Sequence, residues 1–202
     1  MSSLMIEPDS RTDSKWKLRR QRLIRIVRRL CLLQGDRFRL ASGNESTYYF
    51  NMKPAMFNAE GAYLISEFVL EEARKAGAEL IGGLKMGAIP IIACSTQLSF
   101  TSSSLDISGF FVRKAAKNHG TRTLIEGLSA EASLKDKRAL IVDDVTTTGH
   151  SVLQAVEAAR AAGAVIGTVV TVVDRLEGAE TNLAARGLGL VALTTARDYD
   201  IR

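Results

Sequence analysis

The sequence of 202 residues is poor in the side chains that build metal centres and disulfide frameworks, since it has two cysteines and two histidines. Cys31 and Cys94 lie in apolar stretches, outside any CxxC motif or cysteine–histidine cluster. This placement indicates buried thiols in a reducing compartment and argues against a zinc site. No apolar run approaches the roughly 18 residues that a membrane-spanning helix requires. We therefore expect a cytoplasmic protein without a membrane partner.

Linkers, low-complexity tracts and internal repeats are also lacking from Trp16 onward. Hydrophobic residues make up 46% and charged residues 24% of the chain, which is typical of globular rather than disordered proteins. Residues 1–14 are polar and show no periodicity, so we expect a flexible N-terminal extension. Residues 15–202 are predicted to form a single domain, because their number suits one hydrophobic core.

The net charge of +5 comes largely from one basic block, Lys15–Arg29. Within it Leu23, Ile26 and Val27 recur at helical spacing, which leaves the basic side chains on the opposite face. The block predicts an amphipathic first helix with a solvated basic surface; attachment to a membrane surface or to an anionic partner is the alternative. Acidic residues precede the block and no apolar segment follows Met1, which argues against a targeting peptide.

Apolar segments with strand character alternate with helical ones along the rest of the chain. After short extended segments within 36–52, we expect helices at about 59–76, 87–98 and 151–162, and strands at 79–83, 107–112, 139–142, 164–173 and 188–194. This alternation predicts an α/β domain with a mostly parallel sheet flanked by helices. Ligands of such sheets bind at the carboxyl ends of the strands.

A strand, two acids and a hydroxyl-rich turn follow one another in Leu140–Ser151. Adjacent strand residues point in opposite directions, so we expect Asp143 and Asp144 to have different tasks. Carboxylates at a sheet edge can accept hydrogen bonds from sugar hydroxyls or position a hydrated Mg²⁺. The threonines and Gly149 then offer hydroxyls and backbone N–H groups at a helix N-terminus, which favours an anion. A simple helix cap explains one such residue but not all of them, so the segment predicts a sugar-phosphate site.

This segment resembles the signature with which type I phosphoribosyltransferases bind 5-phosphoribosyl 1-diphosphate (PRPP), although Thr146 stands where the family usually has an aliphatic residue. The resemblance implies the type I phosphoribosyltransferase fold, with an N-terminal hood region and a mobile catalytic loop. It also implies Mg²⁺ as cofactor, held mainly through PRPP and without direct protein ligands. The implied PRPP-binding residues are Asp143, Asp144, Val145, Thr146, Thr147, Thr148, Gly149, His150 and Ser151.

A cationic stretch follows the strand predicted at 107–112, and by composition alone it could be a solvated basic loop. Its pattern Arg-Lys-x-x-Lys-x-His-Gly resembles the catalytic loop of orotate phosphoribosyltransferases. By that resemblance Arg113, Lys114, Lys117 and His119 contact PRPP. The resemblance then makes Lys117, as a cation, and the acidic Asp144 the catalytic residues. The family loop reaches into the neighbouring subunit's site, which implies a homodimer with shared active sites.

The aromatic run near residue 49 could be ordinary strand core. Its surroundings, Phe-x-Leu-x-Ser-Gly-x-x-Ser-x-Tyr-Tyr, resemble the N-terminal region of the orotate enzymes, where the positions of Tyr49 and Phe50 line the orotate pocket. Some members carry a lysine where this chain has Ala41, and Lys53 could replace its contact. Likewise, some relatives place a lysine at the position of Met86, and whether the preceding Lys85 replaces it is open.

An arginine at the end of a β-branched strand completes the set of segments. Arg175 can form a bidentate pair with a carboxylate, and orotate carries one at neutral pH. Pairing with Asp174 or Glu177 inside the protein is the alternative. The resemblance maps Arg175 and Thr147 onto orotate contacts.

Together these segments resemble the orotate phosphoribosyltransferase family in their order along the chain. The family activity converts orotate and PRPP to orotidine 5′-monophosphate and pyrophosphate in de novo pyrimidine (UMP) biosynthesis. A phosphoribosyltransferase for a purine or another base is the nearest alternative, but it would not need Arg175. A regulator that keeps the PRPP-binding fold and binds nucleic acid is a second alternative, and it would not need Lys117. We expect small-molecule substrates and no nucleic-acid partner.

Overall fold

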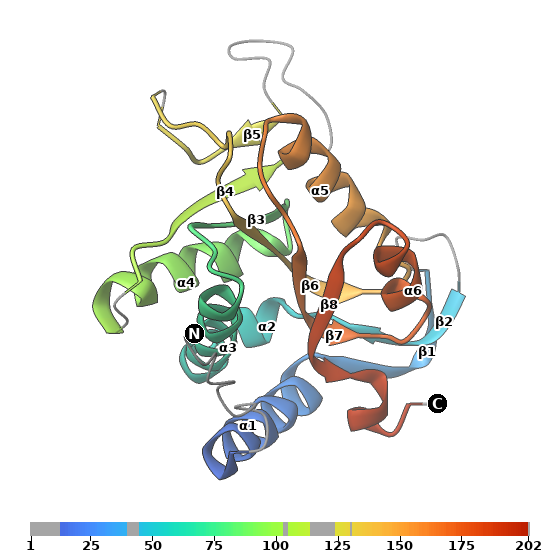
Figure 1. Cartoon of the computed structure of the whole chain (residues 1–202). Helices are drawn as coiled ribbons and strands as arrows, with labels where there is room; N and C mark the ends of the chain where they lie inside the picture. Colours follow the sequence, from blue (N-terminus) through green and yellow to red (C-terminus); the bar gives the residue numbers. More distant parts are fainter. Residues whose placement is uncertain (1–12, 40–44, 103–104, 114–123, 130, 202) are drawn as a thin grey trace, which may run out of the picture.

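A computed structural model describes residues 13–39, 45–102, 105–113, 124–129 and 131–201 (Figure 1). A six-stranded sheet with the order β5-β4-β3-β6-β7-β8 forms its centre. The strands are β3 (Leu80–Leu84), β4 (Ser108–Val112), β5 (Ile125–Glu126), β6 (Ala139–Thr146), β7 (Thr168–Asp174) and β8 (Gly189–Thr195). Only β5 runs antiparallel to its neighbour, so the predicted mostly parallel sheet is confirmed.

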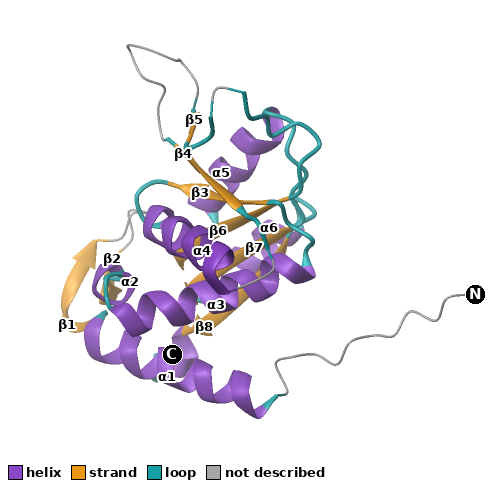
Figure 2. Ribbon diagram, turned by 90° about the vertical axis from the view of Figure 1, so that its left-hand side faces the viewer, coloured by secondary structure: helices purple, strands orange, loops and turns teal. Residues whose placement is uncertain are grey.

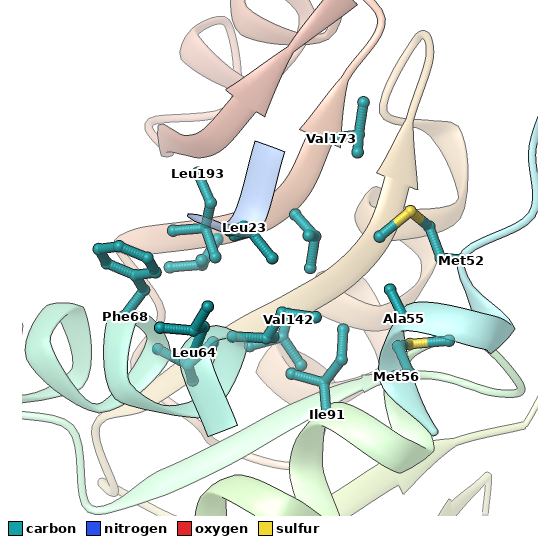
Figure 3. Packing of buried hydrophobic residues seen from close by; sticks show 14 of the residues in the cluster. Leu23, Met52, Ala55, Met56, Leu64, Phe68, Ile91, Val142, Val173 and Leu193 are labelled. Atoms are coloured by element: carbon teal, nitrogen blue, oxygen red, sulfur yellow. The ribbon is translucent and has the colours of Figure 1, made fainter. Parts of the chain in front are cut away.

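Helices cover both faces of this sheet because the strands are apolar on both sides. Successive strand residues point to opposite faces, so Leu140 and Val142 pack on one side and Ile141 on the other. The first face carries α1 (Ser14–Leu30), α3 (Ala59–Lys75) and α4 (Ala88–Ser102), and the second carries α5 (His150–Ala161) and α6 (Ala179–Ala184). Figure 3 shows the first of these cores, where Leu23, Leu64, Phe68 and Ile91 surround Val142.

A separate two-stranded hairpin lies against the carboxyl end of β7. It consists of β1 (Leu32–Arg39) and β2 (Glu45–Phe50), paired antiparallel, and it is followed by the short helix α2 (Lys53–Met56). Phe50 anchors the hairpin in the first core, where its ring lies edge-on to that of Tyr199 at 5.1 Å. Hydrogen bonds from Arg175 to β2 attach the hairpin to the sheet. The hairpin and α2 correspond to the expected hood region.

The basic block forms α1, which lies beside α3 (Figure 2). The helix begins at Ser14 and Asp13 is its N-cap, so these two residues belong to the folded unit rather than to the expected extension 1–14. Four arginines pair with other elements: Arg19 with Glu67 and Glu71, Arg20 with Asp198, Arg22 with Glu60, and Arg28 with Asp200. The other four basic residues of the block, Lys15, Lys17, Arg25 and Arg29, are exposed, so the expected solvated basic surface is present and is supplemented by these ion pairs.

No helix in the described part of the chain is long and apolar enough to cross a membrane. Both cysteines are free thiols; Cys31 is buried, as expected, whereas Cys94 is only half-buried. Burial raises the pKa of the Cys31 thiol to about 11, which keeps it protonated and unreactive near neutral pH.

Candidate active site

The carboxyl end of β6 and the start of α5 form the centre of the site. The strand runs through Thr146, so both acids still belong to it, and Gly149 makes the turn into α5 with a φ of 82°. A left-handed φ of this kind suits glycine because it has no Cβ. The turn encloses a cavity of about 70 Å³ lined by Asp143, Val145, Thr146, Thr147, Thr148, Gly149, His150 and Ser151. Free backbone N–H groups at the start of α5 make this cavity suitable for a phosphate.

The two acids face different neighbours, as the alternation along the strand predicts. Asp143 is 8% exposed and lines the phosphate-sized cavity, where its carboxylate lies 3.5 Å from the Thr146 hydroxyl. Asp144 lies against Gly87, so closely that a Cβ on Gly87 would overlap its carboxylate. The turn after β3 thus meets the end of β6 at Asp144.

Burial raises the pKa of Asp143 well above its usual range, and the adjacent charge of Asp144 raises it further. Burial also raises the pKa of Asp144, which the charge of Lys53 partly opposes. Buried carboxylates need hydrogen-bond donors or cations to be stable in the charged form. A ligand that brings hydroxyl groups or a cation would supply these partners.

The turn between β3 and α4 lies beside the base of the cationic stretch. Lys85 N–H donates to the carbonyl of Val112 at 3.0 Å, and Arg113 N–H donates to the carbonyl of Leu124 at 2.8 Å. Arg113 also forms a 2.9 Å ion pair with Glu126. Both ends of the stretch are therefore fixed at the same sheet edge as the acids. Lys114, Lys117 and His119 lie outside the described residues.

Lys85 and Met86 precede Gly87 in this turn, and the peptide bond between them is cis. Met86 is 70% exposed, and Lys85 forms no ion pair with any described residue. Lys53, at the start of α2, is close enough to Asp144 to influence its carboxylate. Lys53 and Lys85 were considered as substitutes for the family's PRPP-contacting lysines. Of these two, Lys53 is the one whose charge acts on Asp144.

Arg175 lies at the end of β7 and is only 5% exposed. Its Nε donates to Glu177 at 2.7 Å, its Nη2 donates to Ser46 at 3.0 Å, and its guanidinium lies 4.0 Å from the centre of the Tyr48 ring. The internal pairing with Glu177, considered above as an alternative, is therefore present in the free protein. Arg175 borders a cavity of about 870 Å³ lined by Glu45, Ser46, Tyr48, Thr148, Arg175, Leu176, Glu177, Ala196, Arg197 and Ile201.

Tyr49 and Phe50, the aromatics expected to contact the base, do not line this cavity. Phe50 is 3% exposed because it fills the core, and Tyr49 points to the other face of the hairpin, where it stacks on Phe38. Tyr48 takes the place beside Arg175, which alternation along β2 explains, since it lies two residues before the buried Phe50. Thr148 borders both cavities, whereas the expected Thr147 borders only the smaller one.

The described residues contain no group of three or more histidine, cysteine or carboxylate side chains that could hold a metal ion. Asp143 and Asp144 are a pair of adjacent acids at the sheet edge. A pair of this kind is compatible with a cation that takes most of its ligands from a bound phosphate compound and water.

Comparison with known proteins agrees with this geometry. The phosphoribosyl transferase domain family matches residues 83–185. The orotate phosphoribosyltransferase of Bradyrhizobium sp. (strain ORS 278) is 46% identical over 180 residues, which cover 89% of this chain and 96% of the relative. That of Aquifex aeolicus is 37% identical over 178 residues, covering 87% of this chain and 94% of the relative.

Solved structures are similar over most of the chain as well. A crystal structure of orotate phosphoribosyltransferase from Mycobacterium tuberculosis H37Rv in complex with PRPP superimposes with a TM-score of 0.73 at 31% identity. The superposition covers 91% of this chain and 99% of the M. tuberculosis chain. A phosphoribosyltransferase from Corynebacterium diphtheriae gives a TM-score of 0.78 at 33% identity, with the same coverage.

Proposed function

The chain belongs to the orotate phosphoribosyltransferase family, and on this premise we propose that it transfers the 5-phosphoribosyl group of PRPP to orotate. The products are orotidine 5′-monophosphate and pyrophosphate, in de novo pyrimidine biosynthesis. The observation that carries this proposal is the pair of adjacent acids at the end of β6, of which the buried Asp143 lines the phosphate-sized cavity at the start of α5. The larger cavity beside Arg175, which Thr148 borders together with the smaller one, supplies room for a base.

The ribose 5-phosphate end of PRPP binds in the smaller cavity. The turn from Val145 to Ser151 supplies N–H and hydroxyl donors to the 5-phosphate, and the N-terminal end of α5 favours its negative charge. Asp143 and Asp144 accept hydrogen bonds from the ribose hydroxyls. These contacts would add hydrogen-bond donors to two carboxyls whose pKa burial raises in the free protein.

The pyrophosphate end is assigned to the cationic stretch. Orotate N1 attacks the anomeric carbon as the bond to pyrophosphate breaks, so negative charge grows on the leaving group. Arg113, Lys114, Lys117 and His119 stabilise that charge, and Lys117 is the main catalytic cation. The position of the stretch supports this role, because its described ends lie at the same sheet edge as Asp144.

Mg²⁺ is the proposed cofactor. Bound to the oxygens of PRPP, it would neutralise part of the pyrophosphate charge. Asp143 and Asp144 fit such a cation through its water molecules, because two adjacent acids at the sheet edge are too few for a complete protein cage. The protein groups hold the sugar and orient the phosphates.

Arg175 is proposed to bind the orotate carboxylate, with Thr147 at the junction to the ribose site. A carboxylate can approach Arg175 once Glu177 turns away, since Glu177 is the more exposed partner of that ion pair. Tyr48 offers its ring at the cavity wall, in the role that the family pattern gave to Tyr49 and Phe50. The ring of Phe50 packs edge-on against the rings of Tyr48 and Tyr199, which holds Tyr48 in position at the cavity wall.

A homodimer with shared sites is also proposed, and the surface of α4 supports it. No charged residue occurs from Met86 to Leu105. Met86 is 70% exposed and Phe100, near the end of α4, is 86% exposed. Large exposed apolar side chains on an uncharged helix and on the turn before it favour contact with another protein surface. Both cysteines are free thiols, which supports a cytoplasmic location.

Orotate absorbance, followed with PRPP and Mg²⁺, tests the proposal. We expect the wild-type protein to consume orotate and Lys117→Ala to lose roughly 100-fold or more in turnover. Lys17→Ala is the matched control, because Lys17 is an exposed lysine on α1 far along the chain from the site. Wild-type protein that leaves orotate unchanged would contradict the activity. A fully active Lys117→Ala protein would contradict only the assignment of the leaving-group cation.

A further inference from the structure

The cavity beside Arg175 contains a second arginine that neither the motifs nor the family pattern singled out. Arg197 lies on the 3-10 helix η2 (Ala196–Tyr199), which follows the last strand of the sheet. It borders the same cavity of about 870 Å³ as Arg175, Tyr48 and Thr148. A volume of this order suits a small organic ligand.

Arg175 is already engaged in the free protein. Its side chain is 3% exposed, its Nε is paired with Glu177, and its Nη2 is bonded to Ser46. Tyr48 covers one face of its guanidinium at 4.0 Å. The charge of Arg175 is therefore compensated before any substrate arrives.

Arg197, in contrast, is exposed and forms no ion pair with any residue that the structure describes. The two acids nearest to it in sequence are occupied by arginines of α1: Asp198 pairs with Arg20 at 2.6 Å and Asp200 with Arg28 at 2.9 Å. Of the cavity acids, Glu177 pairs with Arg175 and Glu45 with Arg37. Arg197 thus contributes the uncompensated positive charge of this wall.

The backbone of Arg197 is also held firmly in place. Thr195 and Asp198 form a reciprocal capping box around η2. Ala196 and Tyr199, on either side of Arg197, are buried, and the Tyr199 hydroxyl donates to Thr194 at 2.9 Å. Only the side chain of Arg197 remains to be ordered by a ligand, and an exposed guanidinium at a fixed backbone position is well suited to bind a carboxylate.

We propose that Arg197 is a second carboxylate-binding residue of the base site, which selects an acidic pyrimidine together with Arg175. The inference rests on the proposed function and adds to it a specificity-determining residue. Arg175 fixes the hairpin wall and one side of the ligand, while Arg197 meets the acidic substituent from η2. A base without an acidic group would gain nothing from Arg197.

Steady-state kinetics of the full chain test this role. We expect Arg197→Ala to raise the KM for orotate about tenfold, the usual effect of one charge-assisted hydrogen bond, with kcat and the KM for PRPP within about twofold of wild type. Arg197→Lys restores part of the orotate affinity because it keeps the charge. The preference for orotate over uracil, measured as the ratio of kcat/KM values, falls in Arg197→Ala by the same factor.

Arg74→Ala is the matched control, since Arg74 is an exposed arginine on α3 that does not line the cavity and forms no ion pair with a described residue. Thermal unfolding of Arg197→Ala should match wild type, which separates a binding effect from misfolding. Wild-type turnover of orotate with an unchanged orotate KM in Arg197→Ala would overturn this inference alone. Wild-type protein that consumes no orotate would overturn it together with the proposed function.

Discussion

Glu177 accepts a 2.7 Å hydrogen bond from Nε of Arg175, so a carboxylate already occupies the arginine that is proposed to bind the substrate carboxylate. The two side chains differ in exposure, at 3% for Arg175 and 31% for Glu177. The more exposed partner is free to turn toward solvent when a ligand arrives. Glu177 would therefore compete with the carboxylate of a base that binds to Arg175 as proposed.

Replacement of Glu177 by glutamine is expected to strengthen orotate binding. The amide keeps the size of the side chain but removes the competing charge, so the KM for orotate should fall about threefold, in line with the modest energy of a partly exposed ion pair. Steady-state kinetics measure the change, with Glu157→Gln as control because Glu157, on α5, forms an exposed ion pair with Arg186 and does not line the cavity. A higher orotate KM would show instead that Glu177 positions Arg175 for binding.

Truncation of Arg175 should weaken orotate binding selectively. We expect Arg175→Ala to raise the KM for orotate roughly 10- to 100-fold and to leave the KM for PRPP within about twofold. Loss of the contact with Tyr48 should also lower the free energy of unfolding by about 1 kcal/mol. Kinetics and chemical denaturation measure the two effects, with Arg186→Ala as the surface control. Equal loss of orotate and PRPP affinity would contradict a role in base binding.

Asp143→Asn is expected to stabilise the free protein while it impairs turnover. Burial raises the pKa of Asp143 well above its ordinary value of 3.8, so from about pH 4 upward the unfolded chain loses this proton while the native protein retains it. The native state then binds more protons than the unfolded state, and the free energy of unfolding falls as the pH rises toward the raised pKa. Asparagine carries no such proton, so it removes this loss of stability with rising pH.

The advantage of Asp143→Asn in melting temperature should therefore be larger near pH 7 than near pH 4. Turnover should fall roughly 10- to 100-fold, because an amide cannot become the charged acceptor that Asp143 offers to a ribose hydroxyl once PRPP is bound. Thermal unfolding at both pH values measures the first effect, with the exposed Asp106→Asn as control. A pH-independent difference would argue that Asp143 is ionised in the folded protein at both values.

A methyl group on Gly87 should displace the acid that it faces. A Cβ at this position overlaps the Asp144 carboxylate, and a shift of about 1 Å in a catalytic group can lower turnover roughly 100-fold. Gly167→Ala is the matched control, because nothing lies within 4 Å of its Cβ position. The turnover number of both variants is measured by steady-state kinetics. Wild-type turnover in Gly87→Ala would show that the turn moves to make room for the methyl group and that Asp144 keeps its position.

The alternation of strands and helices was sufficient to predict the central sheet, because each strand is a short apolar run next to a clear helical period. The predicted strand 107–112 became β4 (Ser108–Val112), and the predicted helix 151–162 became α5 (His150–Ala161). Short elements such as α6 (Ala179–Ala184) were missed, since six residues carry too little periodicity. The strand order depends on contacts between distant segments and could not be read from local patterns.

In the candidate site, too, the residues of one continuous segment could be predicted and those brought together by the fold could not. Asp143, Asp144 and the turn to Ser151 form one continuous segment, so their cluster was predictable from local sequence. Tyr48 and Arg197 were not, because they reach the Arg175 cavity from segments far apart in the chain. A count of two residues back from the buried Phe50 could have indicated Tyr48. No local pattern marks Arg197, since its free charge depends on α1 arginines that pair with its neighbours.

The ion pair between Arg20 and Asp198 joins positions 178 residues apart. Helix α1 can pack early against α3, which follows it closely in the chain, but it cannot hold η2 until residue 198 has been synthesised. Contacts between such distant segments form late because a long loop must close first. We therefore expect the cavity wall that carries Arg197 to be among the last parts of the fold to assemble, so that the base site would be completed later than the phosphate site.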